Sequence, residues 1–406
     1  MHSASKQGVR RSLAGIAFLA ASTAAAAGDW PQFRGPQRDG VSSEQGLARE
    51  WPAEGPKALW RAQLGPGFSG ISVVAGRAYT MFGVEADEFA ACFDAATGQE
   101  IWRVRTDSQY KDSFGDGPRS TPTVDGERVF VLGARGKLHA LATASGERVW
   151  LRDFVAEFGS TVPRWGFSTS PLVEGDLLLV EVGGADGSGI VAFDKRTGKE
   201  AWRSGSDQAA YAAPIAVTIG SSRQAVFFTS RHLVGLAPGD GALLWKQPWT
   251  TSYDVNASTP VFIPPDKLFV SSGYDVGAAL YRVTGSGVEQ LWRNREMKNK
   301  FSSSVLRDRH LYGFDEGTLK CISAESGETK WRARGFGHGS LILADGHLLV
   351  LGDEGTLAMI EATAGEYLEK ARAKIFSGKT WTVPTLADGK LYLRNEKELL
   401  SLGVAR

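Results

Sequence analysis

The segment Phe193-Asp194-Lys195-Arg196-Thr197-Gly198-Lys199-Glu200-Ala201-Trp202 decides the fold, because variants of it recur along most of the chain. It joins a Thr-Gly turn to a short strand that carries a tryptophan four residues after the glycine. Seven tryptophans hold this position, at spacings of 42, 48, 52, 43, 47 and 39 residues: Trp60, Trp102, Trp150, Trp202, Trp245, Trp292 and Trp331. A repeat of roughly 40–50 residues made of short strands is typical of a propeller or another closed array.

Each repeat contains the same order of four strand signals. In the unit that ends at Trp150, a Ser/Thr-rich strand (residues 120–124) leads through an Asp-Gly turn to an apolar strand (129–132). An alternating strand (138–141), a Ser-Gly turn and the tryptophan strand (147–150) complete the unit. Alternating strands separated by paired turn residues predict four antiparallel strands, which form one blade.

The two ends of the repeat region predict the number of blades. Six units end at Trp102, Trp150, Trp202, Trp245, Trp292 and Trp331, and a seventh covers residues 338 to about 371 without a tryptophan. Residues 381–403 contain only three strand signals, and residues 58–64 form a tryptophan strand that no three strands precede. Joining them predicts an all-β, eight-bladed β-propeller of four-stranded antiparallel blades, closed by an N-terminal strand that completes the C-terminal blade. A β-solenoid or two smaller propellers would leave these half-blades unmatched.

The seven tryptophans are expected to be structural, because a large ring in the outer strand fills the wedge between neighbouring blades. The two cysteines, Cys92 and Cys321, align with Ala140, a small buried position in the third strand. They fall three blades apart, which is far beyond the roughly 6 Å Cα separation of a disulfide. We therefore expect two free, buried thiols.

The composition divides the chain into three parts. Basic residues precede an apolar stretch from Leu13 to Ala21, and small residues continue to Ala27. This order predicts a signal peptide over 1–27, cleaved near Ala27, an N-terminal extension over 28–56 and the propeller over 57–406, with the mature protein in the periplasm or secreted. The apolar run is shorter than the roughly 20 residues of a membrane span, so we expect no transmembrane segment in the mature chain. No cysteine lies near the cleavage region, so we expect no lipid attachment there.

Three segments carry a resemblance to a known family: FDAATGQEIW (93–102), FDKRTGKEAW (193–202) and ISAESGETKW (322–331). They resemble the tryptophan-docking repeat of the PQQ-like β-propeller family, and the resemblance extends from about residue 57 to the end of the chain. DWPQFRGP (29–36) and RDGVS (38–42) resemble the N-terminal stretch of many exported members. The family contains quinoprotein alcohol dehydrogenases, which bind pyrroloquinoline quinone and Ca²⁺ on the propeller axis. It also contains BamB-type scaffolds, which bind proteins without a cofactor.

The resemblance is nearer to the BamB-like members, although BamB is a lipoprotein and this chain lacks the lipidated cysteine. The dehydrogenases carry a disulfide between adjacent cysteines at the quinone, and this chain has no adjacent cysteines. None of the six histidines lies at metal-ligand spacing to another or to a cysteine. No nucleophile motif or phosphate loop is present, and Gly183 to Gly189 is predicted to be a turn inside a blade. We expect a monomer that is not an enzyme and has no metal and no cofactor.

Long connections on one face of the predicted propeller carry the residue types in which binding surfaces are enriched. They cover residues 103–118, 152–166, 246–256 and 293–300. We predict that a protein or peptide partner binds there, on Tyr110, Arg119, Arg164, Trp165, Trp249, Tyr253, Asn256 and Lys300. The alternative is that these side chains pack locally and hold the loops in place. A net charge of +1 offers no positive face to a nucleic acid, so none is expected as a partner.

Hydroxyl side chains recur where these connections enter the inner strands, and they predict a polar mouth on the axis that holds water or a small polar ligand: Ser120, Ser168, Thr169, Ser258, Ser302 and Ser303. Two other functions therefore remain open. One is a quinone-dependent oxidoreductase with an axial site, and the other is a module that binds a carbohydrate or another small ligand.

Overall fold

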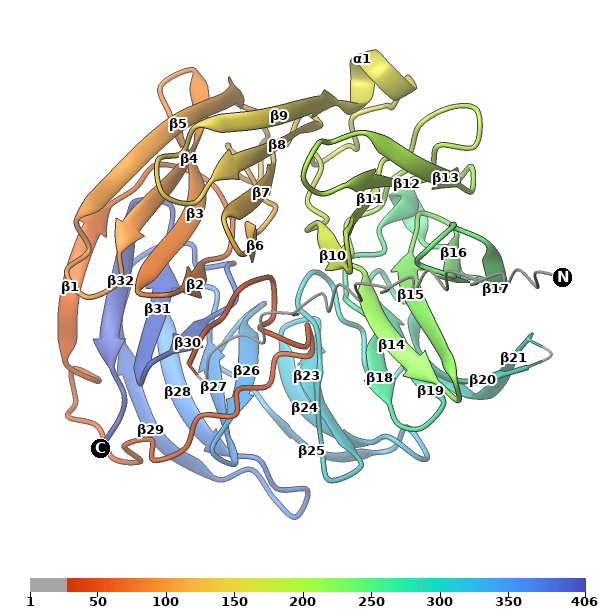
Figure 1. Cartoon of the computed structure of the whole chain (residues 1–406). Helices are drawn as coiled ribbons and strands as arrows, with labels where there is room; N and C mark the ends of the chain where they lie inside the picture. Colours follow the sequence, from red (N-terminus) through yellow and green to blue (C-terminus); the bar gives the residue numbers. More distant parts are fainter. Residues whose placement is uncertain (1–27, 286) are drawn as a thin grey trace, which may run out of the picture.

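The computed structural model describes residues 28–285 and 287–406 as a ring of blades (Figure 1). Strands β1 to β32 form eight four-stranded antiparallel sheets, so the predicted all-β, eight-bladed propeller is confirmed. The predicted signal peptide lies outside the described residues. Helical structure among the described residues is limited to α1 (Phe154–Phe158) and the 3-10 turn η1 (Ser252–Asp254). No helix in this part of the chain is long and apolar enough to cross a membrane.

The first four blades follow one another in sequence, each written here from its inner to its outer strand. Blade 1 is β2 (Ser72–Val74), β3 (Arg77–Val84), β4 (Asp87–Asp94) and β5 (Glu100–Ser108). Blade 2 is β6 (Thr123–Asp125), β7 (Arg128–Leu132), β8 (Lys137–Ala142) and β9 (Arg148–Asp153). Blade 3 is β10 (Leu172–Glu174), β11 (Leu177–Glu181), β12 (Ile190–Asp194) and β13 (Glu200–Ser204). Blade 4 is β14 (Ile215–Ile219), β15 (Ser222–Phe228), β16 (His232–Leu236) and β17 (Leu243–Pro248).

The last four blades continue the ring and return to the N-terminal strand. Blade 5 is β18 (Val261–Ile263), β19 (Lys267–Ser272), β20 (Gly277–Thr284) and β21 (Gly287–Asn294). Blade 6 is β22 (Val305–Arg307), β23 (His310–Asp315), β24 (Thr318–Ser323) and β25 (Thr329–Ala333). Blade 7 is β26 (Ser340–Ala344), β27 (His347–Leu351), β28 (Thr356–Glu361) and β29 (Glu369–Lys374). Blade 8 is β30 (Thr385–Ala387), β31 (Lys390–Arg394), β32 (Glu398–Gly403) and β1 (Ala58–Gln63).

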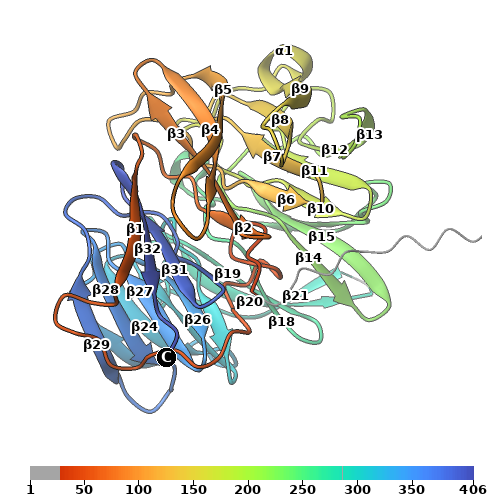
Figure 2. The same ribbon diagram turned by 60° about the vertical axis from the view of Figure 1, so that its left-hand side comes forward.

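Blade 8 closes the ring by combining strands from both ends of the chain. Strand β1 pairs antiparallel with β32, with Trp60 opposite Ser401 and Gln63 opposite Glu398. Figure 2 shows β1 lying beside β32 at the edge of this blade. The outer edge of β32 is thereby paired, as the half-blades in the sequence predicted.

Six of the seven repeated tryptophans join their blade to the next. The indole Nε1 of Trp60 donates to the carbonyl oxygen of Ala95 at 3.1 Å, and that of Trp102 donates to Thr143 at 3.0 Å. The glycine of the following repeat lies against the ring: a Cβ on Gly98 would come within 2.4 Å of Trp60. Only glycine fits there, which explains why a glycine precedes the tryptophan at a fixed distance. Trp245 differs, since it donates to Gln224 of its own blade at 2.7 Å.

The two cysteines occupy the small position that faces the tryptophan. Cys92 pairs with Trp102, and Cys321 pairs with Trp331, in the register that Ala140 has with Trp150. Both thiols are free and buried, as predicted.

The propeller has two faces of different construction. The long-loop face carries the connections from the outer strand of one blade to the inner strand of the next. The turn face, on the opposite side, carries the turns between the first and second strands and between the third and fourth strands of each blade. In Figure 1 the N-terminal extension, drawn in red and orange, crosses the centre of the ring on the turn face.

The N-terminal extension plugs the axis with two arginines, a role that the sequence did not reveal. It begins with a bridge from Trp30 to Val73 of β2, reaches Leu343 of β26 through Val41, and ends beside the C-terminus through Leu47 and Ala405. Between these points the side chains of Arg34 and Arg38 are fully buried.

Neither arginine forms an ion pair among the described residues; both are held by oxygen acceptors that lie mostly at the inner strands. Arg34 donates to the carbonyls of Ser303 at 3.2 Å and Ser304 at 2.6 Å, where the chain enters β22. Arg38 donates to Ser170 at 3.1 Å and Pro214 at 3.0 Å, and also to Pro171. The carbonyls bound by Arg38 precede β10 and β14, so the two guanidiniums together connect the extension to blades 3, 4 and 6.

Candidate functional site

Aromatic side chains surround the axis on the long-loop face. We call the following residues the aromatic belt: Phe68, Tyr110, Phe114, Trp165, Tyr211, Tyr253, Tyr274, Phe301 and Trp381. They come from seven of the eight connections between blades and from the β19–β20 turn. The eighth connection supplies His338, whose ring centroid lies 5.9 Å from that of Phe301. Every blade therefore contributes to one surface.

Contacts between neighbouring members follow the belt around the face. The ring centroids of Phe301 and Trp381 are 5.0 Å apart, those of Trp381 and Phe68 are 5.4 Å apart, and those of Tyr253 and Tyr274 are 6.5 Å apart. Trp165 joins Phe114, Tyr211 and Tyr253 at 6.3, 5.7 and 6.5 Å. These separations lie in the range of favourable aromatic pairs.

Four cationic side chains lie over the rings of the belt. Arg119 lies over the rings of Phe68 and Tyr110, at 5.7 and 4.7 Å. Arg164 lies over Trp165 and Tyr253, at 5.4 and 5.1 Å. Lys300 lies 5.4 Å from the ring of Tyr274, and Lys379 lies 4.4 Å from that of Trp381. The belt thus presents alternating aromatic faces and positive charge, held together by cation–π contacts.

Two buried carboxyl side chains hydrogen-bond to the backbone of two connections that carry the belt. Glu88 of β4 accepts hydrogen bonds from the backbone N–H of Tyr110 at 3.1 Å and of Ala134 at 3.2 Å. Glu181 of β11 accepts one from Ala210, next to Tyr211, at 3.1 Å. Burial raises the pKa of Glu88 to about 7 and raises that of Glu181 well above its usual range. These side chains hold the loops, while the belt itself faces outward.

Six of the eight residues predicted to bind a partner lie at the belt: Tyr110, Trp165 and Tyr253 belong to it, and Arg119, Arg164 and Lys300 lie over its rings. Tyr253 is 63% exposed, Arg164 is exposed, and Tyr110, Arg119, Trp165 and Lys300 are partly buried. Phe114, which is 54% exposed, and Tyr274 belong to the same surface. Whether these residues bind a partner stays a prediction.

The expectation of a surface position is wrong for the other two residues. Trp249 is 2% exposed and donates from Nε1 to the hydroxyl of Ser272 at 3.0 Å. Asn256 is fully buried, and its Nδ2 donates to the carbonyl of Thr229 at 2.8 Å. Both turn inward because they close the connection between blades 4 and 5, so they support Tyr253 instead of joining it at the surface.

The predicted axial hydroxyls lie at the entrance to the inner strands, and all except Ser168 are buried. Several are used within the protein: Ser303 accepts from the N–H of Thr259 at 2.9 Å, and Ser168 donates to the carbonyl of Tyr211 at 3.2 Å. Ser120 and Thr169 are fully buried, and their hydroxyl oxygens have no protein partner among the described residues. The prediction of a polar axial mouth stays open for these two hydroxyls.

The residues near the axis do not fit a centre of quinone and Ca²⁺. Calcium takes six to eight oxygen ligands, commonly including carboxylates. The axial region instead presents hydroxyls on the side of the long loops and two buried arginines on the side of the turns. Over residues 28–285 and 287–406, no group of three His, Cys, Asp or Glu side chains is placed to hold a metal ion.

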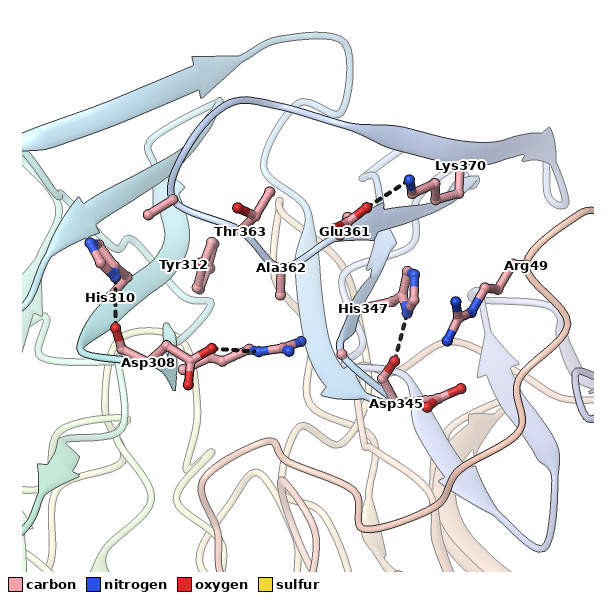
Figure 3. Close-up of a pocket in the computed structure, with 13 residues that line it drawn as sticks. Arg49, Asp308, His310, Tyr312, Asp345, His347, Glu361, Ala362, Thr363 and Lys370 are labelled. Atoms are coloured by element: carbon pink, nitrogen blue, oxygen red, sulfur yellow. Dashed lines mark hydrogen bonds and ion pairs between the residues drawn. The ribbon is translucent and has the colours of Figure 1, made fainter.

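A second candidate site lies on the turn face, between blades 6 and 7, where a cavity of about 600 Å³ opens (Figure 3). The cavity is lined mainly by charged and polar side chains: Arg49, Arg307, Asp308, His310, Tyr312, Asp345, His347, Glu361, Thr363 and Lys370. Figure 3 shows His310 and Asp308 on one side and His347, Asp345 and Arg49 on the other. No motif in the sequence marked this place, because its residues come from β22, β23, β27, β28, β29, the turns beside them and the N-terminal extension.

The fold and its internal repeat define the class of protein: a β-propeller of eight blades joined by tryptophan and glycine. The family model described as outer membrane protein assembly factor BamB matches residues 86–333 and 315–403, so the chain belongs to this family, as predicted. The outer membrane protein assembly factor BamB of Burkholderia pseudomallei (strain K96243) is 27% identical over 287 residues, which cover 60% of this chain and 70% of that protein.

Solved structures show the same fold at lower identity. BamB from Moraxella catarrhalis superposes with a TM-score of 0.63 at 14% identity, over 86% of this chain and 99% of that chain. A quinohemoprotein alcohol dehydrogenase from Comamonas testosteroni superposes with a TM-score of 0.67 at 11% identity, over 95% of this chain and 82% of that chain. At these identities the structures support the fold alone.

Proposed function

We propose that this protein is an exported, non-catalytic scaffold that acts as a monomer and binds a protein or peptide partner through the aromatic belt. The observation that carries the proposal is the belt itself, to which every blade contributes and which joins aromatic rings to Arg119, Arg164, Lys300 and Lys379. Tyrosine, tryptophan and arginine are the residues that dominate binding energy at protein interfaces.

The arrangement of the belt supports binding of a polypeptide. The backbone of the connections that carry it is held by Glu88, Glu181 and Asn256, so little conformational entropy of these loops would be lost on binding. Tyr253 and Phe114 are exposed although they are large and aromatic. The relative from Burkholderia pseudomallei is named an outer membrane protein assembly factor. We take from it the general property of binding a protein, and leave the identity of the partner to experiment.

The test is capture from a periplasmic extract on immobilised mature protein, with single variants in the belt. Tyr253→Ala and Arg164→Ala remove exposed side chains, and Trp165→Ala removes a ring that contacts three other members of the belt. Each should weaken capture of the same partner roughly 10-fold or more, since an interface anchor typically contributes about 2 kcal/mol. The melting temperatures of the exposed variants should stay close to that of the wild type.

Leu243→Ala is the matched control, because Leu243 is 57% exposed on outer strand β17, away from the belt. It should leave capture unchanged. Equal capture by the wild type and all three belt variants would contradict the proposal. Oxidation of alcohols or sugars after addition of pyrroloquinoline quinone and Ca²⁺ would also contradict it. Displacement of the partner by a carbohydrate would instead favour the alternative function, a module that binds carbohydrates or other small ligands.

A further inference from the structure

At the cavity between blades 6 and 7, a histidine stands where another junction has an arginine. At the junction of blades 1 and 2, the guanidinium of Arg77 donates from Nη1 to the carbonyls of Thr143 at 2.8 Å and Ala144 at 3.4 Å. Arg77 is the first residue of β3, two residues before Tyr79. His310 is the first residue of β23, two residues before Tyr312.

The two junctions are otherwise built alike. Tyr79 pairs with Cys92 and lies 6.0 Å from Trp102; Tyr312 pairs with Cys321 and lies 5.9 Å from Trp331. Trp102 donates to Thr143, and Trp331 donates to Thr363. The shorter His310 turns back to its own turn, where Nδ1 meets the carbonyl of Asp308 at 2.8 Å. The space that a guanidinium fills at the first junction therefore stays open at the second.

One cation of this cavity, Arg49, is left without a partner among the described residues. The carboxylates are engaged: Asp308 with Arg307 at 3.1 Å, Glu361 with Lys370 at 2.6 Å, and Asp345 with the N–H groups of Gly46 and Leu47, both at 3.1 Å. By contrast, Nη1 of Arg307 is buried and has no hydrogen-bond partner in the described part of the chain. Arg49 is exposed at the rim and forms no hydrogen bond or ion pair with the described residues. Arg49 is thus available to an anion, and Arg307, although paired with Asp308 through Nε, is the second guanidinium in the lining of the cavity.

The histidines add acceptors for hydroxyl groups. Nδ1 of His347 meets the carbonyl of Asp345 at 2.7 Å, and His310 makes the same contact with Asp308. A carbonyl only accepts, so Nδ1 carries the proton in both rings, and Nε2 of a neutral ring is free to accept from a ligand. A cavity of about 600 Å³ is much larger than an inorganic anion needs and lies within the usual range for small-ligand sites.

We propose that this cavity binds a hydroxylated organic anion, such as a phosphorylated or carboxylated sugar. The anionic group would lie between Arg49 and Arg307, and the hydroxyls would face His310 and His347. The site is on the turn face, so it is independent of partner binding by the aromatic belt.

Titration calorimetry of the mature protein with glucose 6-phosphate and glucuronate tests the proposal, with glucose and inorganic phosphate as partial ligands. We expect at least one of the two hydroxylated anions to bind, and both partial ligands to bind at least 10-fold more weakly. Binding of glucose with equal affinity would overturn the role of the arginines. Equal binding of inorganic phosphate would mean an adventitious anion only. No heat of binding with either glucose 6-phosphate or glucuronate at millimolar concentration would overturn the site.

Variants connect the binding to the cavity. Arg49→Gln should weaken binding about 10-fold, whereas Arg295→Gln, which removes an exposed arginine of blade 5, should not change it. His310→Arg recreates the side chain of the first junction and should abolish binding without lowering the melting temperature. Undiminished binding by a folded His310→Arg protein would refute the assignment. The reverse change, Arg77→His, alters the junction of blades 1 and 2 and should leave binding at the cavity between blades 6 and 7 unaffected.

Discussion

Replacing Arg38 by methionine tests whether the N-terminal extension is an integral part of the propeller. Arg38→Met keeps most of the apolar stem and removes all five N–H donors. The partners are the carbonyls of Ser170, Pro171 and Pro214, with the side chains of Thr123 at 3.4 Å and Gln32 at 2.9 Å. These acceptors belong to blades 2, 3 and 4 and to the extension itself, so one substitution loosens several blades at once.

The magnitude follows from the acceptors that remain. Three hydrogen bonds to buried carbonyls are lost, although Pro171 keeps its bond from the hydroxyl of Thr123 at 2.7 Å. A net hydrogen bond contributes about 1 kcal/mol, so the loss is about 3 kcal/mol of unfolding free energy. Burial lowers the pKa of Arg38 to about 9, which leaves the guanidinium charged at neutral pH. Methionine also removes this buried charge, which returns part of the desolvation cost and keeps the net loss from exceeding this value.

Urea unfolding followed by tryptophan fluorescence measures the effect. We expect a lower midpoint for Arg38→Met at an unchanged m value. Arg309→Met is the matched control, since the side chain of Arg309 is 81% exposed and pairs only with the exposed Glu325; it should change stability by less than about 0.5 kcal/mol. If both variants shift the midpoint equally, the extension does not stabilise the ring and the reasoning is wrong.

Three further predictions concern the blades and their buried groups. Trp150→Ala should lose roughly 3–5 kcal/mol in the same unfolding assay, because the ring packs on Phe130 and Phe193 at 5.8 and 6.4 Å and its removal leaves a cavity. The pKa of Glu88 is about 7 in the folded protein against 4.5 for the free side chain, so its contribution to stability is present below pH 4.5 and is lost as the pH rises through 7. Glu88→Gln should remove about 3 kcal/mol of the fall in stability between pH 4.5 and 8; an unchanged pH profile would contradict this. Thiol titration should find two groups in denatured protein and slow reaction in native protein at pH 8, because burial raises the pKa of Cys92 to about 12 and that of Cys321 to about 11.

The blades could be predicted from the sequence because their determinants are local and repeated. The spacing from Gly98 to Trp102 reports both a turn and a packing contact, since the ring of one repeat lies on the glycine of the next. The incomplete final blade and the isolated strand around Trp60 predicted the closure for the same reason. Burial of Cys92 and Cys321 followed from the register alone.

The candidate sites were harder to predict because they depend on contacts between distant parts of the chain. Trp249 has the composition of an interface residue, and only the packing on Ser272 shows that it is buried. The role of the N-terminal extension could not be predicted because Arg34 and Arg38 donate to carbonyls of Ser303 and Ser170, which lie more than a hundred residues away in the sequence. A comparison of Arg77 with His310 across aligned repeats would have marked the cavity between blades 6 and 7, since the two differ in length at an otherwise equal position.

The most direct test of the account is site-specific photo-crosslinking of the folded protein in its own compartment. A photoreactive amino acid at position 114 lies on the aromatic belt, and one at position 243 lies on an outer strand with similar exposure. The account predicts a discrete adduct with a protein partner from position 114, none from position 243, and loss of the adduct when Tyr253→Ala is added. Equal adducts from both positions, or an adduct only from position 243, would contradict binding through the long-loop face.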